Sequence, residues 1–212
     1  MDRTGARMDG RRMVCAVGRG GVGVKAGEGD GVTPVGVWRL EQVLFRADRL
    51  AAPGRGPGTR PIGPRDVWCD DPQAAAYNAA VQAPFPGSAE RLRRPDPLYD
   101  LVGVLDFNRS PTVSGAGSAI FLHVWRAPRR ATEGCVAFAR RDLIWILGRW
   151  QPWRRVVVRG WGEAGAIRQG RRSRPSAPPF GRPLPLGRAP RPPCGRSRRD
   201  AALAGPERAV QP

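Results

Sequence analysis

Glycine and proline interrupt this chain so often that long regular elements have no room to form. The 212 residues include 28 glycines and 23 prolines, which leave only short apolar runs between them. Both residue types end strands and favour turns, so short runs bounded by them are typical of β-strands joined by tight connections. The pattern predicts a mainly β fold whose sheets form a sandwich or a barrel-like arrangement.

The apolar runs can be assigned individually. Residues 99–107 (YDLVGVLDF) and 119–125 (AIFLHVW) are typical of buried strands, and residues 154–159 (RRVVVR) of a closing strand. Residues 35–46 form one strand or two, while residues 13–17 and 22–24 are expected to pair as a hairpin. The one clear helix is expected at residues 139–148, where apolar residues follow a helical spacing and Gly148 suits a helix end. The folded domain is predicted to span residues 12–160.

The last part of the chain has a different composition. Residues 166–212 contain eleven arginines and ten prolines, with only Asp200 and Glu207 as acidic residues. Without a periodic apolar pattern, such a segment cannot bury enough surface to offset the entropy lost on ordering. We predict a disordered basic tail there, and we expect Cys194, which lies in it, to be non-catalytic.

The formal net charge of +18 comes almost entirely from arginine, since Lys25 is the only lysine. Selection for phosphate contacts would recruit lysine as well, whereas GC-rich coding raises Arg, Gly, Ala and Pro together. We therefore favour coding bias and expect no specific nucleic-acid partner, although binding of nucleic acid through the tail remains an alternative. The charge still favours anionic surfaces in a salt-dependent way.

Cysteine and histidine usage argues against a metal site. The four cysteines are widely separated, and one histidine cannot complete a Cys2His2 zinc site. We expect no metal and no organic cofactor. No run approaches the roughly 20 apolar residues that cross a bilayer, and residues 1–18 show no apolar signal-peptide core. We also expect a monomer.

The pair His123 and Cys135 carries the candidate chemistry. His123 lies near the end of an apolar strand, and a loop leads from it to Thr132-Glu133-Gly134-Cys135. A cysteine nucleophile needs a nearby base, because a free thiol has a pKa of about 8.5. It also needs backbone N–H groups for the oxyanion, and a glycine before the cysteine provides the backbone freedom for this. We expect a helix to begin directly after this segment, with its N-terminus favouring the thiolate. Taken alone, however, both residues are more often structural.

Three elements in order resemble the YkuD-type L,D-transpeptidase catalytic domain. His123 on a strand and Thr132-Glu133-Gly134-Cys135 match the family's histidine and its Ser/Thr-x-Gly-Cys motif. Thr33-Pro34-Val35-Gly36 is similar to the family's T-P-x-G element. Residues 68–72 (WCDDP) and 77–78 (YN), with the GCVA ending, look like the subgroup common in alpha-proteobacteria. The resemblance covers about residues 12–160.

The resemblance implies a cysteine acyltransferase of bacterial cell-wall assembly. It implies that Cys135 is the nucleophile, that His123 is the general base, and that Gly134 and Thr132 support the oxyanion. Peptidoglycan stem peptides would be the partners, and D-Ala would leave as a cross-link forms. The periplasm or cell envelope would be the location, although the sequence shows no export signal. We expect Trp68, Tyr77 and Asn78 either to line the cleft or to order a loop. Asp70 is expected to bind a substrate amine or to cap a turn, and we favour the turn.

Two positions depart from the family pattern. Val124 stands where members often carry Gly, but any residue offers the carbonyl that orients the imidazole. Ala137 stands where many members carry Arg, and Arg140 or Arg141 could substitute for that guanidinium. A rival hypothesis is therefore a catalytically degenerate member of the same fold that only binds peptidoglycan.

Overall fold

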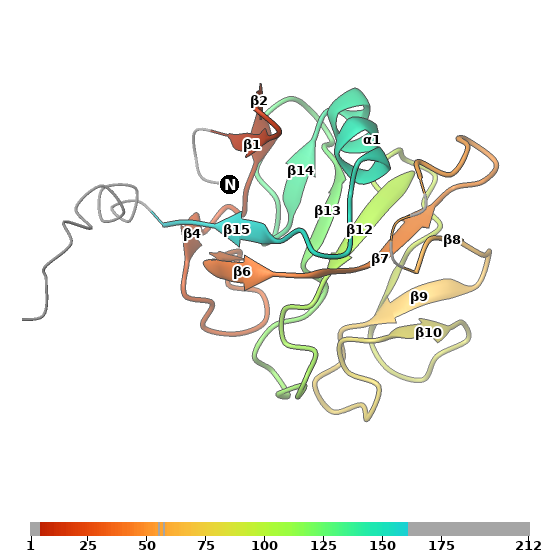
Figure 1. Cartoon of the computed structure of the whole chain (residues 1–212). Coiled ribbons are helices and arrows are strands. Elements are labelled where there is room, and N and C mark those ends of the chain that lie inside the picture. Colours follow the sequence, from red (N-terminus) through yellow and green to blue (C-terminus); the bar gives the residue numbers. More distant parts are fainter. Residues whose placement is uncertain (1–4, 55, 57, 161–212) are drawn as a thin grey trace, which may run out of the picture. The chain divides into compact units, whose positions relative to one another are not determined.

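A six-stranded mixed sheet forms the centre of the computed structural model, which describes residues 5–54, 56 and 58–160 (Figure 1). Three of its strands come from the apolar runs at residues 35–46, 99–107 and 119–125, and a fourth directly follows Cys135. The strand order is β3-β14-β13-β12-β7-β8. The bounds are β3 Cys15–Ala16, β7 Leu40–Phe45, β8 Arg60–Pro61, β12 Leu101–Leu105, β13 Phe121–Val124 and β14 Val136–Phe138.

Both faces of this sheet are covered, which explains why its central strands are buried throughout. On one face, Leu101, Leu122 and Val136 join a core with Leu143 and Leu147 of helix α1 (Arg140–Gly148). On the opposite face, a second core contains Val102, Val104 and Phe121 together with Trp68, Tyr99 and other apolar residues. Side chains alternate along each strand, so β12 and β13 contribute to both cores.

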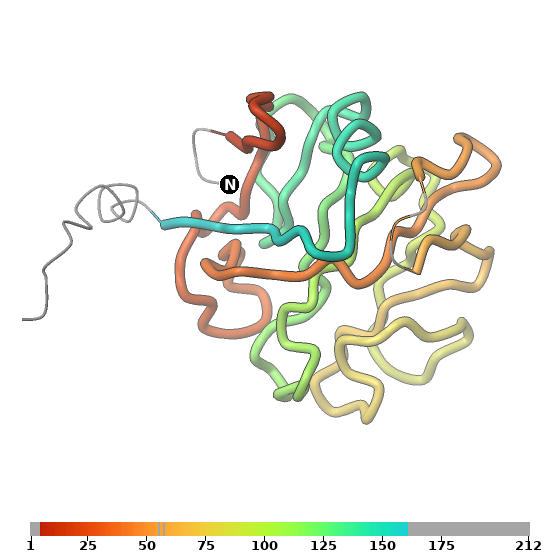
Figure 2. Tube along the Cα trace, in the orientation of Figure 1, coloured from red at the N-terminus to blue at the C-terminus, as the bar shows by residue number. Residues whose placement is uncertain are grey.

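Smaller sheets surround the central one. A three-stranded sheet of order β10-β9-β11 carries Trp68 against the second core. Three two-stranded sheets pair β1 with β2, β4 with β5, and β15 with β6. The bounds are β1 Ala6–Met8, β2 Arg11–Met13, β4 Val22–Gly23, β5 Thr33–Pro34, β6 Gly36–Trp38, β9 Asp66–Cys69, β10 Ala80–Gln82, β11 Ala89–Arg91 and β15 Val156–Val158. Figure 2 shows how the last described strand, β15, returns to lie beside β6, which comes early in the chain.

The mainly β prediction and the helix near the C-terminal end of the domain are confirmed, and residues 35–46 form two strands. The folded part begins earlier than residue 12, because β1 starts at Ala6. The predicted tail at 166–212 lies outside the described residues. Among the described residues, no helix has the length and apolar character that a membrane crossing requires.

The predicted hairpin of residues 13–17 and 22–24 is wrong. Cys15–Ala16 pairs with β14, and Val22–Gly23 pairs in parallel with Thr33–Pro34. The Gly-rich connection lets the chain turn, but the short apolar runs on either side do not specify their partners.

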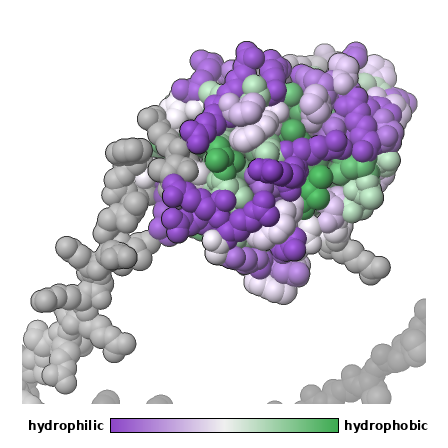
Figure 3. All heavy atoms as spheres, turned by 90° about the horizontal axis from the view of Figure 1, so that it is seen from above, coloured by the Kyte–Doolittle hydropathy of each residue, from purple (hydrophilic) through white to green (hydrophobic). Residues whose placement is uncertain are grey.

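Hydrophilic side chains dominate the face seen in Figure 3, with small apolar patches between them.

Candidate active site

Two adjacent parallel strands position His123 and the residue that follows Cys135. In the pairing of β13 with β14, Leu122 lies opposite Val136 and His123 lies opposite Ala137. Paired residues on neighbouring strands point to the same side of a sheet, and so do residues two apart on one strand. Cys135 precedes Ala137 by two positions, so its side chain projects from the same face as His123. This is the face opposite helix α1.

The imidazole of His123 is buried and fixed on two sides. Only 5% of the residue is exposed, and its Nδ1 lies 2.8 Å from the carbonyl oxygen of Val124. A carbonyl accepts, so Nδ1 carries the proton and Nε2 keeps a free lone pair. The Tyr99 ring stands edge-on to the imidazole, with 5.5 Å between ring centroids. Burial lowers the pKa of His123 to about 4, so the ring is neutral at pH 7. The Val124 departure therefore preserves the orienting carbonyl.

The Cys135 thiol is held by two backbone groups. Its Sγ donates to the carbonyl of Ala119 at 3.1 Å and accepts from the N–H of Phe121 at 3.3 Å. Burial raises the pKa of Cys135 to about 12, so the resting thiol is protonated. The expected helix N-terminus beside this sulfur is wrong, because β14 intervenes and α1 begins only at Arg140. Val136–Phe138 is apolar and forms a strand paired with β13, so these residues do not become the first turn of the helix.

Thr132 and Gly134 shape the loop that presents Cys135. The Thr132 hydroxyl donates to the Cys135 carbonyl at 2.6 Å and accepts from the Gly134 N–H at 3.2 Å. Gly134 has a φ of 137°, a conformation that residues with a side chain rarely adopt. Any side chain there would also approach the carbonyl oxygen of Val32, 3.1 Å from an added Cβ. The glycine of the T-x-G-C motif is therefore required by its backbone conformation and its close packing.

The Thr33 side chain hydrogen-bonds to this loop, although the sequence did not single it out as a site residue. Its fully buried hydroxyl donates to the Gly134 carbonyl at 2.8 Å and accepts from the Gly18 N–H at 2.8 Å. It lies 101 residues before Gly134, so only the fold brings them together. The T-P-x-G resemblance was the one signal in the sequence that pointed to this residue.

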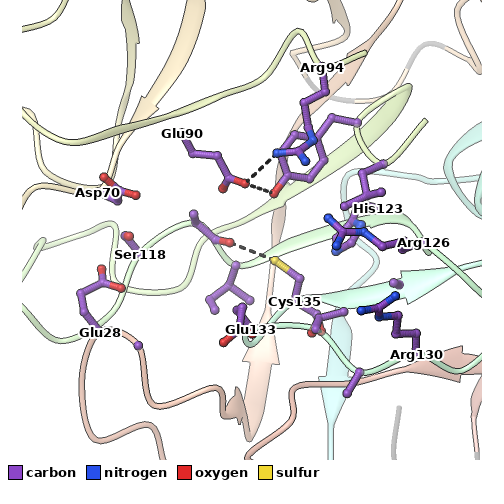
Figure 4. Close-up of a pocket in the computed structure, with 18 residues that line it drawn as sticks. Glu28, Asp70, Glu90, Arg94, Ser118, His123, Arg126, Arg130, Glu133 and Cys135 are labelled. Carbon is purple, nitrogen blue, oxygen red and sulfur yellow. Dashed lines mark hydrogen bonds and ion pairs between the residues drawn. The ribbon is translucent and has the colours of Figure 1, made fainter. Parts of the chain in front are cut away.

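A cleft of about 510 Å³ opens beside the two candidate catalytic residues (Figure 4). His123 and Cys135 both line it. Charged and apolar residues from several loops complete the walls. They include Glu28, Asp70, Glu90, Arg94, Tyr99, Ser118, Ile120, Arg126, Arg130, Thr132 and Glu133.

Of the residues expected to contact substrate, only Asp70 lines this cleft. Trp68, Tyr77 and Asn78 are buried, at 1%, 5% and 2% exposure. Asn78 Oδ1 accepts from Trp68 Nε1 at 3.1 Å and from the Ala119 N–H at 3.0 Å. The three side chains thus support the loop whose Ala119 carbonyl receives the Cys135 thiol, which matches the loop-ordering alternative.

The guanidinium that Ala137 lacks is not replaced from helix α1. Arg140 contacts the Arg49 carbonyl and Asp100, Arg141 faces Asp142, and neither lines the cleft. The arginines of the cleft come from elsewhere, with Arg126 and Arg130 in the loop between β13 and β14. These two arginines could not be assigned to a cleft from the sequence, because arginines in a loop are usually exposed to solvent.

One of three comparisons with known proteins gives a match. Neither the curated proteins nor the solved structures contain a match to the chain. Residues 3–158 match a family described as YkuD, the L,D-transpeptidase catalytic domain. The match covers well over half of the chain and includes both His123 and Cys135. The chain therefore belongs to the YkuD family of L,D-transpeptidase catalytic domains.

Proposed function

We propose that the protein is an active cysteine L,D-transpeptidase that forms an acyl-enzyme with a peptidoglycan stem tetrapeptide and transfers it to an amine. The observation that carries this proposal is that His123 on β13 and Cys135, directly before β14, face the same side of the central sheet and line one cleft. The family match supports the substrate class, since the family acts on peptidoglycan peptides. Such a substrate agrees with a location in the cell envelope.

The first half of the reaction makes a thioester. His123 Nε2 accepts the thiol proton as Cys135 Sγ attacks the carbonyl that precedes the terminal D-Ala. The Gly134 N–H already donates to Thr132, so the Cys135 N–H is our candidate donor to the oxyanion. The C–N bond then breaks, His123 returns the proton to the leaving amine, and D-Ala departs.

In the second half, the Cys135 thiolate is the leaving group. The amine of a second stem peptide attacks the thioester while His123 accepts its proton, and the thiolate leaves and is reprotonated. Because burial favours the neutral thiol and the neutral imidazole, we infer that the resting pair is uncharged and that the proton moves to His123 during the reaction. Water would hydrolyse the same thioester.

Acylation by a carbapenem tests this proposal, because carbapenems acylate the family's cysteine. We expect intact-mass measurement to find one adduct on the wild-type protein and on Cys194→Ala, and none on Cys135→Ala. The Cys194→Ala variant controls for the removal of a cysteine as such. An unmodified wild-type protein, or the same adduct on Cys135→Ala, would reject the proposal.

The alternative is a degenerate member that binds peptidoglycan without chemistry. The observation in its favour is the burial that raises the pKa of Cys135 to about 12, which is typical of an inert thiol. Sacculus pull-down together with the carbapenem experiment separates the two. Binding without an adduct or released D-Ala would support the degenerate protein.

A further inference from the structure

Charges of opposite sign occupy opposite sides of the candidate nucleophile. Figure 4 shows Glu28, Asp70 and Glu90 on one side of the Cys135 sulfur and Arg126 and Arg130 on the other, while Arg94 lies 3.8 Å from Glu90 and is paired with it. A cleft with a positive and a negative side favours ligands that carry the complementary charges in the same order. This division is a property of the cleft, separate from the two catalytic side chains.

The basic side has unused binding capacity. The guanidinium groups of Arg126 and Arg130 are exposed and form no hydrogen bond or close ion pair within the described residues. Arg126 interacts with Asp96 only through its charge, which adds to the Arg94 hydrogen bond in lowering the pKa of that carboxyl. Arg94, by contrast, is held by both oxygens of Asp96 at 2.9 and 2.8 Å. A free guanidinium offers a planar pair of donors that matches a carboxylate. Arg126 and Arg130 are therefore suited to bind a carboxylate of the ligand.

The acidic side also has an unsatisfied group. Glu28 accepts from the Tyr77 hydroxyl, and Glu90 accepts from the Tyr99 hydroxyl at 2.8 Å. Asp70 Oδ1 is buried and has no hydrogen-bond partner within the described part of the chain. A buried carboxylate oxygen without a donor is costly, and a ligand that brings N–H donors removes that cost. Burial also raises the pKa of Glu90, which a bound cation would counteract.

Resting on the proposed transpeptidase function, we propose that this cleft orients a zwitterionic peptide donor across Cys135. The C-terminal carboxylate lies toward Arg126 and Arg130, and the side-chain ammonium of the diamino acid lies toward Asp70 and Glu90. The scissile carbonyl then lies above the sulfur. The S–C bond forms, the C–N bond breaks, and the departing amino acid carries the carboxylate that the arginines hold. The reverse orientation would place like charges together.

Paired donor peptides test this orientation. One peptide has a free C-terminal carboxylate and a free side-chain amine, a second is C-terminally amidated, and a third is N-acetylated on the side chain. The binding variants are Arg126→Gln/Arg130→Gln and Asp70→Asn/Glu90→Gln. The matched controls are Arg129→Gln and Asp71→Asn, neighbours that do not line the cleft. The measurement is kcat/KM for release of the C-terminal residue.

Each binding variant is expected to lose one preference and keep the other. We expect the wild type to prefer the free acid over the amide, and the free amine over the acetylated peptide, by about tenfold each. The arginine variant would reduce only the carboxylate preference to about twofold, and the acidic variant only the amine preference. Unchanged preferences in both variants, or equal losses in the controls, would overturn the proposed orientation.

The orientation can also be tested without chemistry. Calorimetric titration of the same three peptides into Cys135→Ala protein, with and without the charge substitutions, measures binding alone. Charge-specific loss of affinity there supports the orientation even if the wild type forms no acyl-enzyme, which would reject only the proposed function. Carbapenem acylation with charge-blind binding would reject the orientation and retain the function.

Discussion

The hydroxyl of Thr33 joins backbone segments that are far apart in the chain. Its removal should therefore lower both the stability of the protein and the rate of Cys135 acylation. Thr33→Val leaves the buried Gly18 N–H and Gly134 carbonyl without this partner. We expect a loss of about 2 kcal/mol in the free energy of unfolding and slower acylation of Cys135, because the loop before it loosens. Urea denaturation and intact-mass kinetics measure the two effects. The exposed Thr112 serves as control, and Thr112→Val should change stability by less than about 0.5 kcal/mol.

The burial of His123 predicts a specific dependence of stability on pH. Its folded-state pKa of about 4 lies below the ordinary value of 6.5, so between these values only the unfolded chain binds the proton. Stability should therefore fall as pH drops from 6.5 toward 4. At pH 4.5 this loss amounts to roughly 2–3 kcal/mol.

Denaturation of the wild type and His123→Gln at pH 7 and at pH 4.5 isolates this contribution. The wild type should lose more stability than the variant over this interval, since the carboxyl groups are the same in both proteins. Equal losses in the two proteins would show that His123 is protonated as readily in the folded state as in the unfolded chain.

Single residues differ in how far the sequence could identify them. His123 and Cys135 were predictable because their motif depends on neighbours in the chain. The role of Thr33 depends on a contact across 101 positions; the T-P-x-G pattern points to the residue but does not indicate that contact. Trp68 and Asn78 were expected at a cleft wall or in an ordered loop, and only coordinates distinguish these, since both uses require polar aromatic and amide side chains.

Among the elements, helix α1 covers the face of the sheet opposite the cleft. Substitutions beneath the helix should therefore change stability without changing the reaction of Cys135. Gly103 of β12 lies under this helix, and an added Cβ would come within 2.8 Å of Leu40 and 3.3 Å of Leu147. We expect Gly103→Ala to cost about 1–2 kcal/mol by overpacking, with acylation of Cys135 unchanged. Thermal denaturation and the carbapenem assay measure both. Gly23→Ala, in a strand with space around it, should be close to neutral.

The elements themselves were predictable where the apolar run was long. Strands β12 and β13 and helix α1 followed from uninterrupted apolar patterns. The segments Cys15–Ala16, Val22–Gly23 and Val136–Phe138 are too short to show a period, so their partners are decided by tertiary pairing. This is why the hairpin was wrong and why the strand between Cys135 and α1 was missed.

For the whole molecule, the cleft and the C-terminal arginines are separate in sequence, which predicts separable properties. Every described residue that lines the cleft lies between Glu28 and Ala137. A chain ending at residue 160 should therefore keep the wild-type rate of Cys135 acylation. It should elute from immobilised DNA at lower salt, because eleven arginines are absent. Loss of acylation in a shortened chain with an unchanged circular dichroism spectrum would contradict this separation.

The parallel ladder between β13 and β14 has a consequence for how such a protein can diverge. Hydrogen bonds between the strands, together with the contacts of Thr132 and Gly134, set the spacing of the base and the nucleophile. Mutations, insertions or deletions at residues 126–131 can therefore accumulate without misaligning the reaction centre. Arg126 and Arg130 lie in this segment. Related proteins can thus acquire new donor preferences by drift in one loop, while the chemistry on the sheet is inherited intact.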